Sequence, residues 1–176
     1  MSATAHRLFF ALWPDEAARQ ALVGWQTHNL AGDLRWQHRA DLHMTLHFLG
    51  QVDNARRDGL RDLGASVRGS PFSLVIDEIG YWPGPQILWA GPTSLPGELI
   101  ALHRQLGDGL LSLGFALDER VYRPHITLAR KVPHEPRSVP LQPFTCVVDR
   151  FALVESLPGA LPAYRPLTTW QLGRHA

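Results

Sequence analysis

The sequence is poor in the residues that mark several classes of protein. Cys146 is the only cysteine among 176 residues, so the chain cannot form an internal disulfide. It lies in an apolar, strand-like run, which favours a buried thiol over a nucleophile. The formal net charge is only +1, without the strong basic excess that is typical of proteins that follow a long phosphate backbone. A small phosphate-bearing substrate, or one end of an RNA, remains compatible with this charge.

Long hydrophobic runs are absent as well. The apolar run at residues 8–13 is too short to cross a bilayer, and the first residues lack the basic start and cleavage site of a signal peptide. The hydrophobic share of 45% and charged share of 19% are ordinary for a globular protein and exclude extensive disorder. We therefore expect a cytoplasmic protein of one domain with no membrane partner, and a monomer by default.

What the sequence does contain is one short pattern written twice. Residues 42–49 read Leu-His-Met-Thr-Leu-His-Phe-Leu, and residues 124–130 read Pro-His-Ile-Thr-Leu-Ala-Arg. The tetrapeptide His-x-Thr-Leu thus begins at His43 and again at His125, 82 residues later. Both copies alternate polar with apolar residues, which is the period of a β-strand. Two strands that face each other would offer a pair of imidazoles across a groove.

Regular alternation also predicts which side chains share a face. His43 and Thr45 would share one face with His47, and His125 would share its face with Thr127. The residues between them would point to the core: Met44, Leu46 and Phe48 in the first copy, Ile126 and Leu128 in the second.

Around the motifs, the hydrophobic pattern predicts an α+β protein. Helices are expected over about 14–30 (stopped by Gly32), over 53–67 (capped by Asp53), and within 94–113 (ended by Gly114). Residues 81–85 are rich in turn formers, and the proline-rich stretch 131–143 predicts a surface loop. Strands are predicted at 7–12, 34–37, 42–49, 72–79, 87–90, 121–130, 144–155 and 163–172.

The order strand, helix, strand occurs twice. The first strand at Leu8 precedes its counterpart at Ile87 by 79 residues, close to the spacing of the histidines. We therefore predict one bilobal domain over residues 1–176, with repeats at about 6–80 and 86–155 and a closing strand at about 163–172. Each pseudo-symmetric lobe would be an antiparallel sheet with outer helices, and the active-site groove would lie between the sheets.

The duplicated motif, together with residues 7–12, 42–50 and 123–130, resembles the 2H phosphoesterases. Within them it is similar to the bacterial and archaeal RNA 2′,3′-cyclic phosphodiesterases, once named 2′-5′ RNA ligases. The similarity covers nearly the whole chain in order and spacing. It implies a bilobal fold, no cofactor, and metal-independent hydrolysis of RNA or nucleotide 2′,3′-cyclic phosphate ends to 2′-phosphomonoesters. It also allows weak, reversible 2′-5′ ligation.

Opening a cyclic phosphodiester needs a base, an acid and donors for the developing charge. By the resemblance, His43 would protonate the leaving 3′ oxygen and His125 would activate water, although spacing alone leaves these roles exchangeable. Thr45 and Thr127 can bind the non-bridging oxygens. Arg130 lies on the core face if its strand is regular, and reaches the phosphate only at a bulge or strand end. The family often carries a basic residue there.

Alternative hypotheses remain open. His43 and His47 form His-x-x-x-His, a zinc pattern on helices, but the alternation indicates a strand and no glutamate follows the first histidine, so no metal is expected. Trp36, Trp89 and Phe48 could stack a base, although core packing is the stronger expectation for each. A binding module without turnover, and net RNA joining, are the competing functions. Intact histidines and threonines argue against the first, and the high concentration of water argues against the second.

Overall fold

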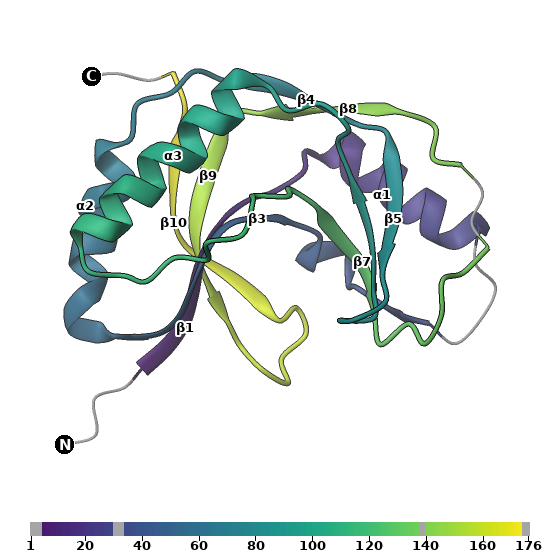
Figure 1. Cartoon of the computed structure of the whole chain (residues 1–176), viewed down its shortest axis with the longest axis horizontal. Helices are drawn as coiled ribbons and strands as arrows, with labels where there is room; N and C mark the ends of the chain where they lie inside the picture. The colour runs from purple at the N-terminus through teal and green to yellow at the C-terminus, as the bar shows by residue number, and fades with distance from the viewer. Residues whose placement is uncertain (1–4, 30–33, 138–139, 174–176) are drawn as a thin grey trace.

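A computed structural model describes residues 5–29, 34–137 and 140–173 as an α+β fold (Figure 1). The helices are α1 (Glu16–Asn29), α2 (Arg57–Ser66) and α3 (Gly97–Ser112), with short 3-10 helices η1 (Arg39–Asp41) and η2 (Asn54–Arg56). The strands are β1 (Ala5–Leu12), β2 (Arg35–Trp36), β3 (Met44–Asp53), β4 (Phe72–Ile76), β5 (Glu78–Trp82), β6 (Ile87–Gly91), β7 (Ile126–Arg130), β8 (Phe144–Val148), β9 (Arg150–Ser156) and β10 (Tyr164–Gln171).

The main sheet joins strands from both halves of the chain. Its order is β10-β9-β1-β3-β7-β6-β5, with β2 paired to β7, and the pairings are antiparallel. In the described part of the chain, β3 meets β7 at one residue pair, Met44 and Ile126. The two sheets predicted for the two lobes are therefore halves of one sheet, joined at a narrow contact. A second, two-stranded sheet pairs β4 with β8 and so also links the two halves.

Two strands predicted as continuous are each divided between the sheets. The predicted strand 72–79 contains β4, which pairs with β8, and the start of β5, which pairs with β6. The predicted strand 144–155 contains β8 and most of β9. The breaks fall at Asp77 and Asp149, while the apolar pattern continues on both sides. The predicted turn at 81–85 is also shifted, because Tyr81 and Trp82 belong to β5 and the turn occupies residues 83–86.

Both motif strands begin one residue after their histidine. β3 starts at Met44 and runs to Asp53, and β7 starts at Ile126, whereas strands were predicted over 42–49 and 121–130. Pro124 lacks the backbone N–H needed to continue a ladder, and η1 precedes the first histidine. His43 and His125 therefore sit at the entry to their strands.

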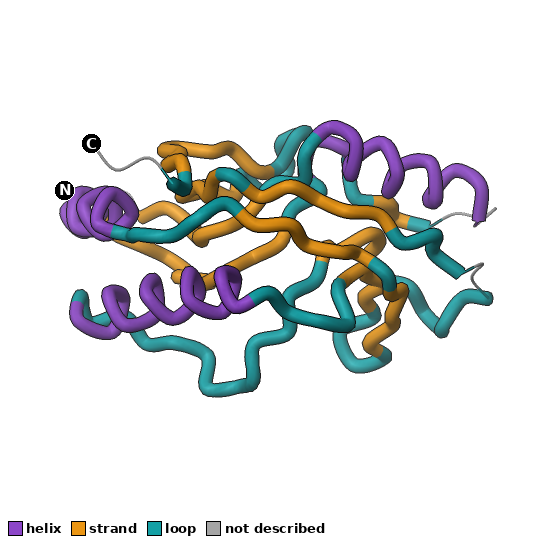
Figure 2. Tube along the Cα trace, turned by 90° about the horizontal axis from the view of Figure 1, so that it is seen from above, coloured by secondary structure: helices purple, strands orange, loops and turns teal. Residues whose placement is uncertain are grey.

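The two long helices, α1 and α3, pack on different halves of the molecule. α1 packs against β8, and its Gln26 Nε2 donates to the Leu128 carbonyl of β7 at 3.3 Å. α3 instead packs against β3 and α2. Figures 1 and 2 accordingly show α1 at one end of the molecule and α2 with α3 at the other. α3 thus covers the half to which its flanking strands β6 and β7 do not belong, whereas α1 connects β1 of one half to β2, which pairs with β7 in the other.

Helix boundaries follow the sequence in outline. Asp53 is the N-cap of η2, not of α2, and its side chain makes no capping hydrogen bond there, so the prediction of a helix capped by Asp53 is wrong in detail. The predicted end of the first helix at Leu30, and its stop at Gly32, lie outside the described residues. No helix in the described ranges is both long and apolar enough to span a membrane.

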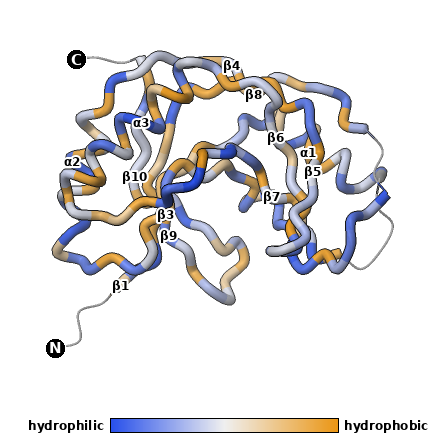
Figure 3. Tube along the Cα trace, viewed as in Figure 1, coloured by the Kyte–Doolittle hydropathy of each residue, from blue (hydrophilic) through white to orange (hydrophobic). Residues whose placement is uncertain are grey.

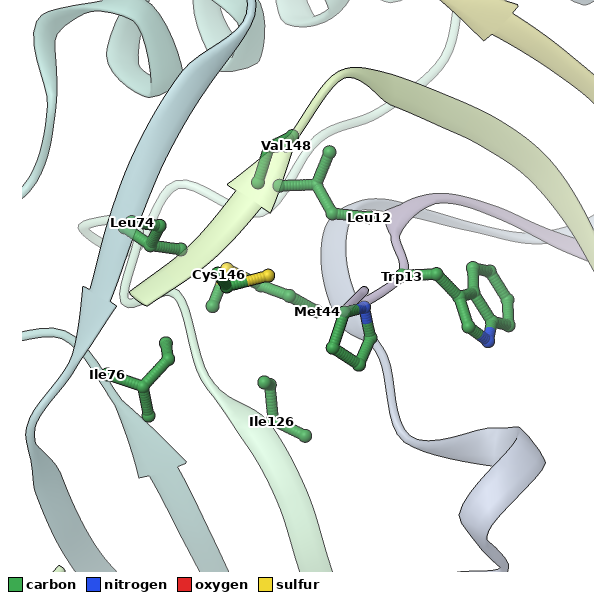
Figure 4. Close-up of a pocket in the computed structure, with 9 residues that line it drawn as sticks. Leu12, Trp13, Met44, Leu74, Ile76, Ile126, Cys146 and Val148 are labelled. Atoms are coloured by element: carbon green, nitrogen blue, oxygen red, sulfur yellow. The ribbon is translucent and has the colours of Figure 1, made fainter. Parts of the chain in front are cut away.

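The hydrophobic core runs through the junction of the halves. Hydrophobic residues concentrate on the strands and alternate along α3 (Figure 3). At the junction, side chains of β1, β3, β4, β7 and β8 point into an apolar cavity of about 10 Å³ (Figure 4). Cys146 lies there as a buried thiol, as predicted, and burial raises its pKa. The narrow β3–β7 contact is thus supported by side-chain packing.

Candidate active site

The two motif histidines share one backbone arrangement. The Nδ1 of His43 donates to the Asp41 carbonyl at 2.7 Å, and the Nδ1 of His125 donates to the Arg123 carbonyl at 2.9 Å. A carbonyl oxygen can only accept, so Nδ1 carries the proton of each neutral ring. Nε2 then holds the lone pair in both. Each histidine thus contacts the carbonyl two residues before it, and this shared contact fixes the same tautomer in both rings.

Aromatic rings enclose His43. Its ring centroid lies 5.1 Å from that of Phe9, 5.5 Å from Trp13 and 4.7 Å from Tyr164, which is edge-on. Only 9% of the residue is exposed. This wall combines β1 and the residue after it with β10, so two parts of the chain that are distant in sequence enclose one imidazole.

Two tryptophans flank His125, which is only half-buried. Trp82 meets its ring edge-on at 4.5 Å, and Trp89 lies at 6.5 Å. Trp89 is directly opposite Thr127 in the β6–β7 register. Thr127 is itself 7% exposed. The second motif thus has its own aromatic wall, built from β5 and β6.

Burial and a nearby guanidinium lower the pKa of both histidines. Burial is the main cause and brings the pKa of His43 to about 4, against the opposing effect of its hydrogen bond to Asp41. Burial also lowers the pKa of His125. The charge of Arg130 lowers both pKa values, and His125 contributes to lowering that of His43. These three side chains therefore lie within electrostatic range of one another, and both rings are neutral near pH 7 in the free protein.

The predicted hydroxyls and the predicted cation occupy the same region. Thr45 Oγ1 is 3.2 Å from His43 Nε2, and since that nitrogen is unprotonated in the neutral ring, the hydroxyl donates. Arg130 is the exposed last residue of β7, where the strand ends and regular alternation stops. The structure thus brings His43, His125 and Arg130 together.

A β-bulge changes the faces of the first motif. Ala11 pairs with Thr45 and Phe10 with His47, which leaves Leu46 as an extra residue. Beyond the bulge Phe48 stacks on Phe9 with centroids 6.2 Å apart. The prediction that His47 shares the face of His43, and that Phe48 points to the core, is therefore wrong. The insertion of one residue reverses the alternation.

His47 instead belongs to a stack of three rings. Its Nε2 donates to the His103 carbonyl of α3 at 2.8 Å. His47 and His103 stack at 4.0 Å, and His103 and Tyr122 at 3.8 Å. Burial, followed by the charge of His47, lowers the pKa of His103 to about 4. A zinc pair of His43 and His47 does not form, and no cluster of three or more His, Cys, Asp or Glu occurs among the described residues.

A pocket of about 560 Å³ adjoins the second histidine. It lies between β3, α3, the β5–β6 turn and the segment that precedes β7. The residues that matter most for its chemistry are Thr45, Phe48, Trp82, His103, Tyr122 and His125. It is large enough for a ligand of nucleotide size.

Sequence reasoning missed Asp41 and Tyr164. The Asp41 carboxylate is buried and accepts the backbone N–H of Ala163 at 2.9 Å and of Tyr164 at 3.0 Å. It therefore ties the start of β10 to the turn before His43. Neither residue belongs to a motif, and their contact depends on a separation of 123 residues, so no local signal could have shown it.

Comparison with known proteins identifies the family. Residues 13–160 match the model of the 2′-5′ RNA ligase superfamily. The chain belongs to this superfamily. It is 31% identical over 170 residues to the RNA 2′,3′-cyclic phosphodiesterase of Escherichia coli (strain K12), covering 94% of this chain and 96% of that protein. It is also 31% identical to the RNA 2′,3′-cyclic phosphodiesterase of Thermotoga maritima, over 75% of this chain and 76% of that protein.

The fold of this 2′-5′ RNA ligase superfamily member agrees with solved structures. The crystal structure of E. coli LigT complexed with 3′-AMP superimposes with a TM-score of 0.89 at 28% identity, over 97% of this chain and all of that one. The family expected from the duplicated motif is confirmed, and so is the α+β fold with antiparallel sheets.

Proposed function

We propose that this protein hydrolyses 2′,3′-cyclic phosphates at RNA ends or on small nucleotides, yielding 2′-phosphomonoesters without a metal or cofactor. The observation that carries the proposal is the pair of histidines with matched backbone contacts at Nδ1, which leave the lone pair of each ring on Nε2. The relatives that bear the name RNA 2′,3′-cyclic phosphodiesterase across most of the chain support the substrate. The groove would lie between the two halves of the main sheet.

The reaction assigns one proton transfer to each histidine. His125 Nε2 takes a proton from water as the water oxygen attacks phosphorus. The bond from phosphorus to the 3′ oxygen breaks, and protonated His43 delivers its Nε2 proton to that oxygen. The product has a 2′-phosphate and a free 3′-hydroxyl, and solvent exchange restores both histidines. The same ring opening with an RNA 5′-hydroxyl in place of water as the nucleophile would give slow 2′-5′ ligation.

Electrostatics supports these roles once the substrate is bound. The Asp41 carboxylate raises the pKa of His43, whereas no carboxylate among the described residues acts in this way on His125. Burial nevertheless holds the pKa of His43 at about 4 in the free protein. Its role as an acid therefore requires the phosphate anion, which favours the imidazolium and offsets the charge of Arg130.

The remaining site residues bind the phosphate. Thr45 and Thr127 would donate their hydroxyls to the non-bridging oxygens, and Arg130 would neutralise the charge that develops in the transition state. Binding would release the Thr45 hydroxyl from His43 Nε2, leaving that nitrogen free to hold its catalytic proton.

The direct test is hydrolysis of an oligoribonucleotide that ends in a 2′,3′-cyclic phosphate, with EDTA present. We expect wild-type turnover to survive chelation and to give a phosphatase-sensitive 2′-phosphate. His43→Ala and His125→Ala should each lose at least about two orders of magnitude of kcat/KM, while His28→Ala on the exposed face of α1 should retain activity. Loss of wild-type activity in EDTA, or a 3′-phosphate product, would contradict the mechanism.

A further inference from the structure

Thr45 lies at a point where the main sheet gives its backbone little support. On one side, the pairing of β3 with β7 consists of Met44 and Ile126 and extends no further along β3 in the described part of the chain. On the other side, the pairing with β1 is interrupted by the bulge at Leu46, the next residue. A bulge leaves its extra residue unpaired and disrupts the ladder locally. The position of the Thr45 hydroxyl therefore depends on contacts from outside these two ladders.

One such contact comes from Tyr122, on the segment that precedes β7. Its hydroxyl donates to the Thr45 carbonyl at 2.9 Å. Burial raises the pKa of this hydroxyl, so it keeps its proton and stays a donor. The bond lies one residue beyond the last β3–β7 pair, so a side chain holds the two segments together where strand pairing has ended. The Tyr122 hydroxyl thus holds the backbone of the residue whose own hydroxyl lies 3.2 Å from His43 Nε2.

The Tyr122 ring is itself held in the stack of three rings. Its plane lies 15° from that of His103 on α3, and the plane of His103 lies 20° from that of His47. His47 is fixed to the helix by the hydrogen bond from its Nε2 to the His103 carbonyl. Its ring also lies against Gly107 of α3, where an added Cβ would be 3.3 Å from His47 Cε1. The stack therefore joins β3, α3 and the segment before β7.

The support behind Tyr122 is rigid and uncharged near pH 7. Burial lowers the pKa of His47, and the pKa of His103 is brought to about 4 by burial and by the charge of His47. Two neutral rings can pack face to face with no like charges to separate them. The helix that carries His103 is anchored in the core by Leu99, Leu102 and Leu106. The Tyr122 ring thus rests on an element that is itself fixed in the core.

The three rings line the pocket beside His125, but the contacts of the stack are made to the protein. The Tyr122 hydroxyl and His47 Nε2 each donate to a backbone carbonyl. Because His47 and Tyr122 both stack on His103, they cover its two opposite faces. This arrangement indicates groups that set the position of another residue.

From these contacts we propose that Tyr122 is a positioning residue for the reaction, supported by His103 and His47. Its hydroxyl fixes the Thr45 carbonyl, and thereby holds the Thr45 hydroxyl beside His43, where it can bind a non-bridging oxygen. The inference rests on the proposed function, in which Thr45 binds the cyclic phosphate. It extends that function by three residues outside the two His-x-Thr-Leu motifs.

The first experiment removes the hydroxyl and keeps the ring. On an RNA that ends in a 2′,3′-cyclic phosphate, Tyr122→Phe should lower kcat about fivefold and change KM less than about twofold, because a misplaced donor weakens the transition state more than the bound substrate. The matched control is Tyr81→Phe, since the Tyr81 hydroxyl donates to the Val132 carbonyl at 2.8 Å, a bond of the same kind that involves no site residue. The control should lose similar thermal stability and keep the wild-type kcat. A rise in KM alone in Tyr122→Phe, or an equal loss of kcat in both variants, would overturn the proposal.

The second experiment asks whether Tyr122 acts through Thr45. In a Thr45→Val background, Tyr122→Phe should lower kcat by less than about twofold, because the hydroxyl that it positions is already gone. In a Thr127→Val background, the loss from Tyr122→Phe should stay at about fivefold. Equal losses in the two backgrounds would contradict the proposal. A loss from Tyr122→Phe that exceeds the loss from Thr45→Val itself would also contradict it.

The third experiment tests the supporting rings. His103→Ala removes the middle ring of the stack, and kcat should fall about as far as in Tyr122→Phe. His103→Phe keeps a ring on which Tyr122 can stack and should restore most of kcat. Wild-type kcat in His103→Ala, or an equal loss in His103→Phe, would remove the stack from the proposed role.

A measurement on the free protein is independent of turnover. The Thr45 hydroxyl donates to the neutral His43 Nε2, so its displacement in Tyr122→Phe should raise the pKa of His43 in an NMR titration, by no more than Thr45→Val does. Tyr81→Phe should leave this pKa unchanged. The wild-type His43 pKa in Tyr122→Phe would overturn the positioning role. Failure of the wild-type protein to hydrolyse any cyclic phosphate would instead overturn the proposed function, and this titration would still test the contact.

Discussion

The two histidine sites have the same local backbone and different surroundings. Each ring donates Nδ1 to the carbonyl two residues before it. His43, however, is enclosed by three rings and influenced by the buried Asp41, whereas His125 is half-buried between two tryptophans. A repeated motif thus repeats the tautomer, while the neighbours that set the proton affinity come from the rest of the chain. The following predictions test this difference.

The largest effect should separate acid from base. His43→Gln and His125→Gln are each expected to lose about two orders of magnitude or more in hydrolysis of a cyclic-phosphate-ended RNA. A substrate with sulfur in place of the 3′ oxygen needs no protonation of its leaving group. It should restore most of the rate to His43→Gln and little to His125→Gln, measured as kcat/KM. The opposite pattern of rescue would exchange the two roles.

The next prediction concerns how the free energy of unfolding depends on pH. Because the folded pKa of His43 is about 4, below its ordinary 6.5, the unfolded chain binds the proton more readily. Stability is therefore complete above about pH 6.5 and falls as the pH drops toward 4, by about 3 kcal/mol in total from this residue. Urea unfolding across this range should show a shallower loss in His43→Gln. The same dependence of the free energy of unfolding on pH in wild type and His43→Gln would show that the pKa of His43 in the folded protein is not near 4.

The ligand should alter the same titration. NMR of the His43 ring is expected to show its pKa near 4 in the free protein and clearly higher with a bound nucleoside 2′-phosphate, because the anion favours the imidazolium. The pKa of His125 should rise with the same ligand. A His43 pKa that does not move on binding would exclude it as the acid in the proposed step.

Substitution of Asp41 should change the pKa of His43 but not that of His125. The two carboxylate oxygens of Asp41 each accept one backbone N–H, from Ala163 and Tyr164. In Asp41→Asn one of these oxygens becomes an NH₂ group, a donor that faces another donor. This change should lower the free energy of unfolding by about 2 kcal/mol. It also removes the charge that raises the pKa of His43, so kcat should fall and the alkaline limb of its pH profile, where His43 loses its proton, should shift to lower pH. The control is Asp149→Asn, an exposed carboxylate paired with Arg150, which should cost less than about 0.5 kcal/mol.

The smallest effect should distinguish the threonines. Thr45→Val and Thr127→Val keep the side-chain shape and remove one hydroxyl, and each is expected to lower kcat/KM roughly tenfold. Thr45→Val should also raise the pKa of His43 slightly, since its hydroxyl donates to the neutral Nε2. Equal His43 titration curves in the two variants would contradict this contact.

Much of the fold could be predicted from residue patterns, because strands and helices have different apolar periods. The patterns failed where tertiary pairing intervenes. The apolar runs continue through Asp77 and Asp149, so nothing local shows that the chain changes sheet there. The bulge at Leu46 also has no signal in the sequence. The polar and apolar residues alternate regularly there, and only the register with β1 shows the extra residue.

The sequence alone identified the family and the α+β class and predicted the two histidines and two threonines as site residues, because these inferences rest on short-range motifs and periodicity. The tertiary structure alone shows which rings enclose each histidine, how Asp41 holds β10, and how the bulge at Leu46 turns His47 toward α3. Those features depend on contacts between residues up to 123 positions apart and on a strand register that no single segment encodes. The proton affinity of each histidine follows from such contacts, since burial and neighbouring charges act through space and not along the chain.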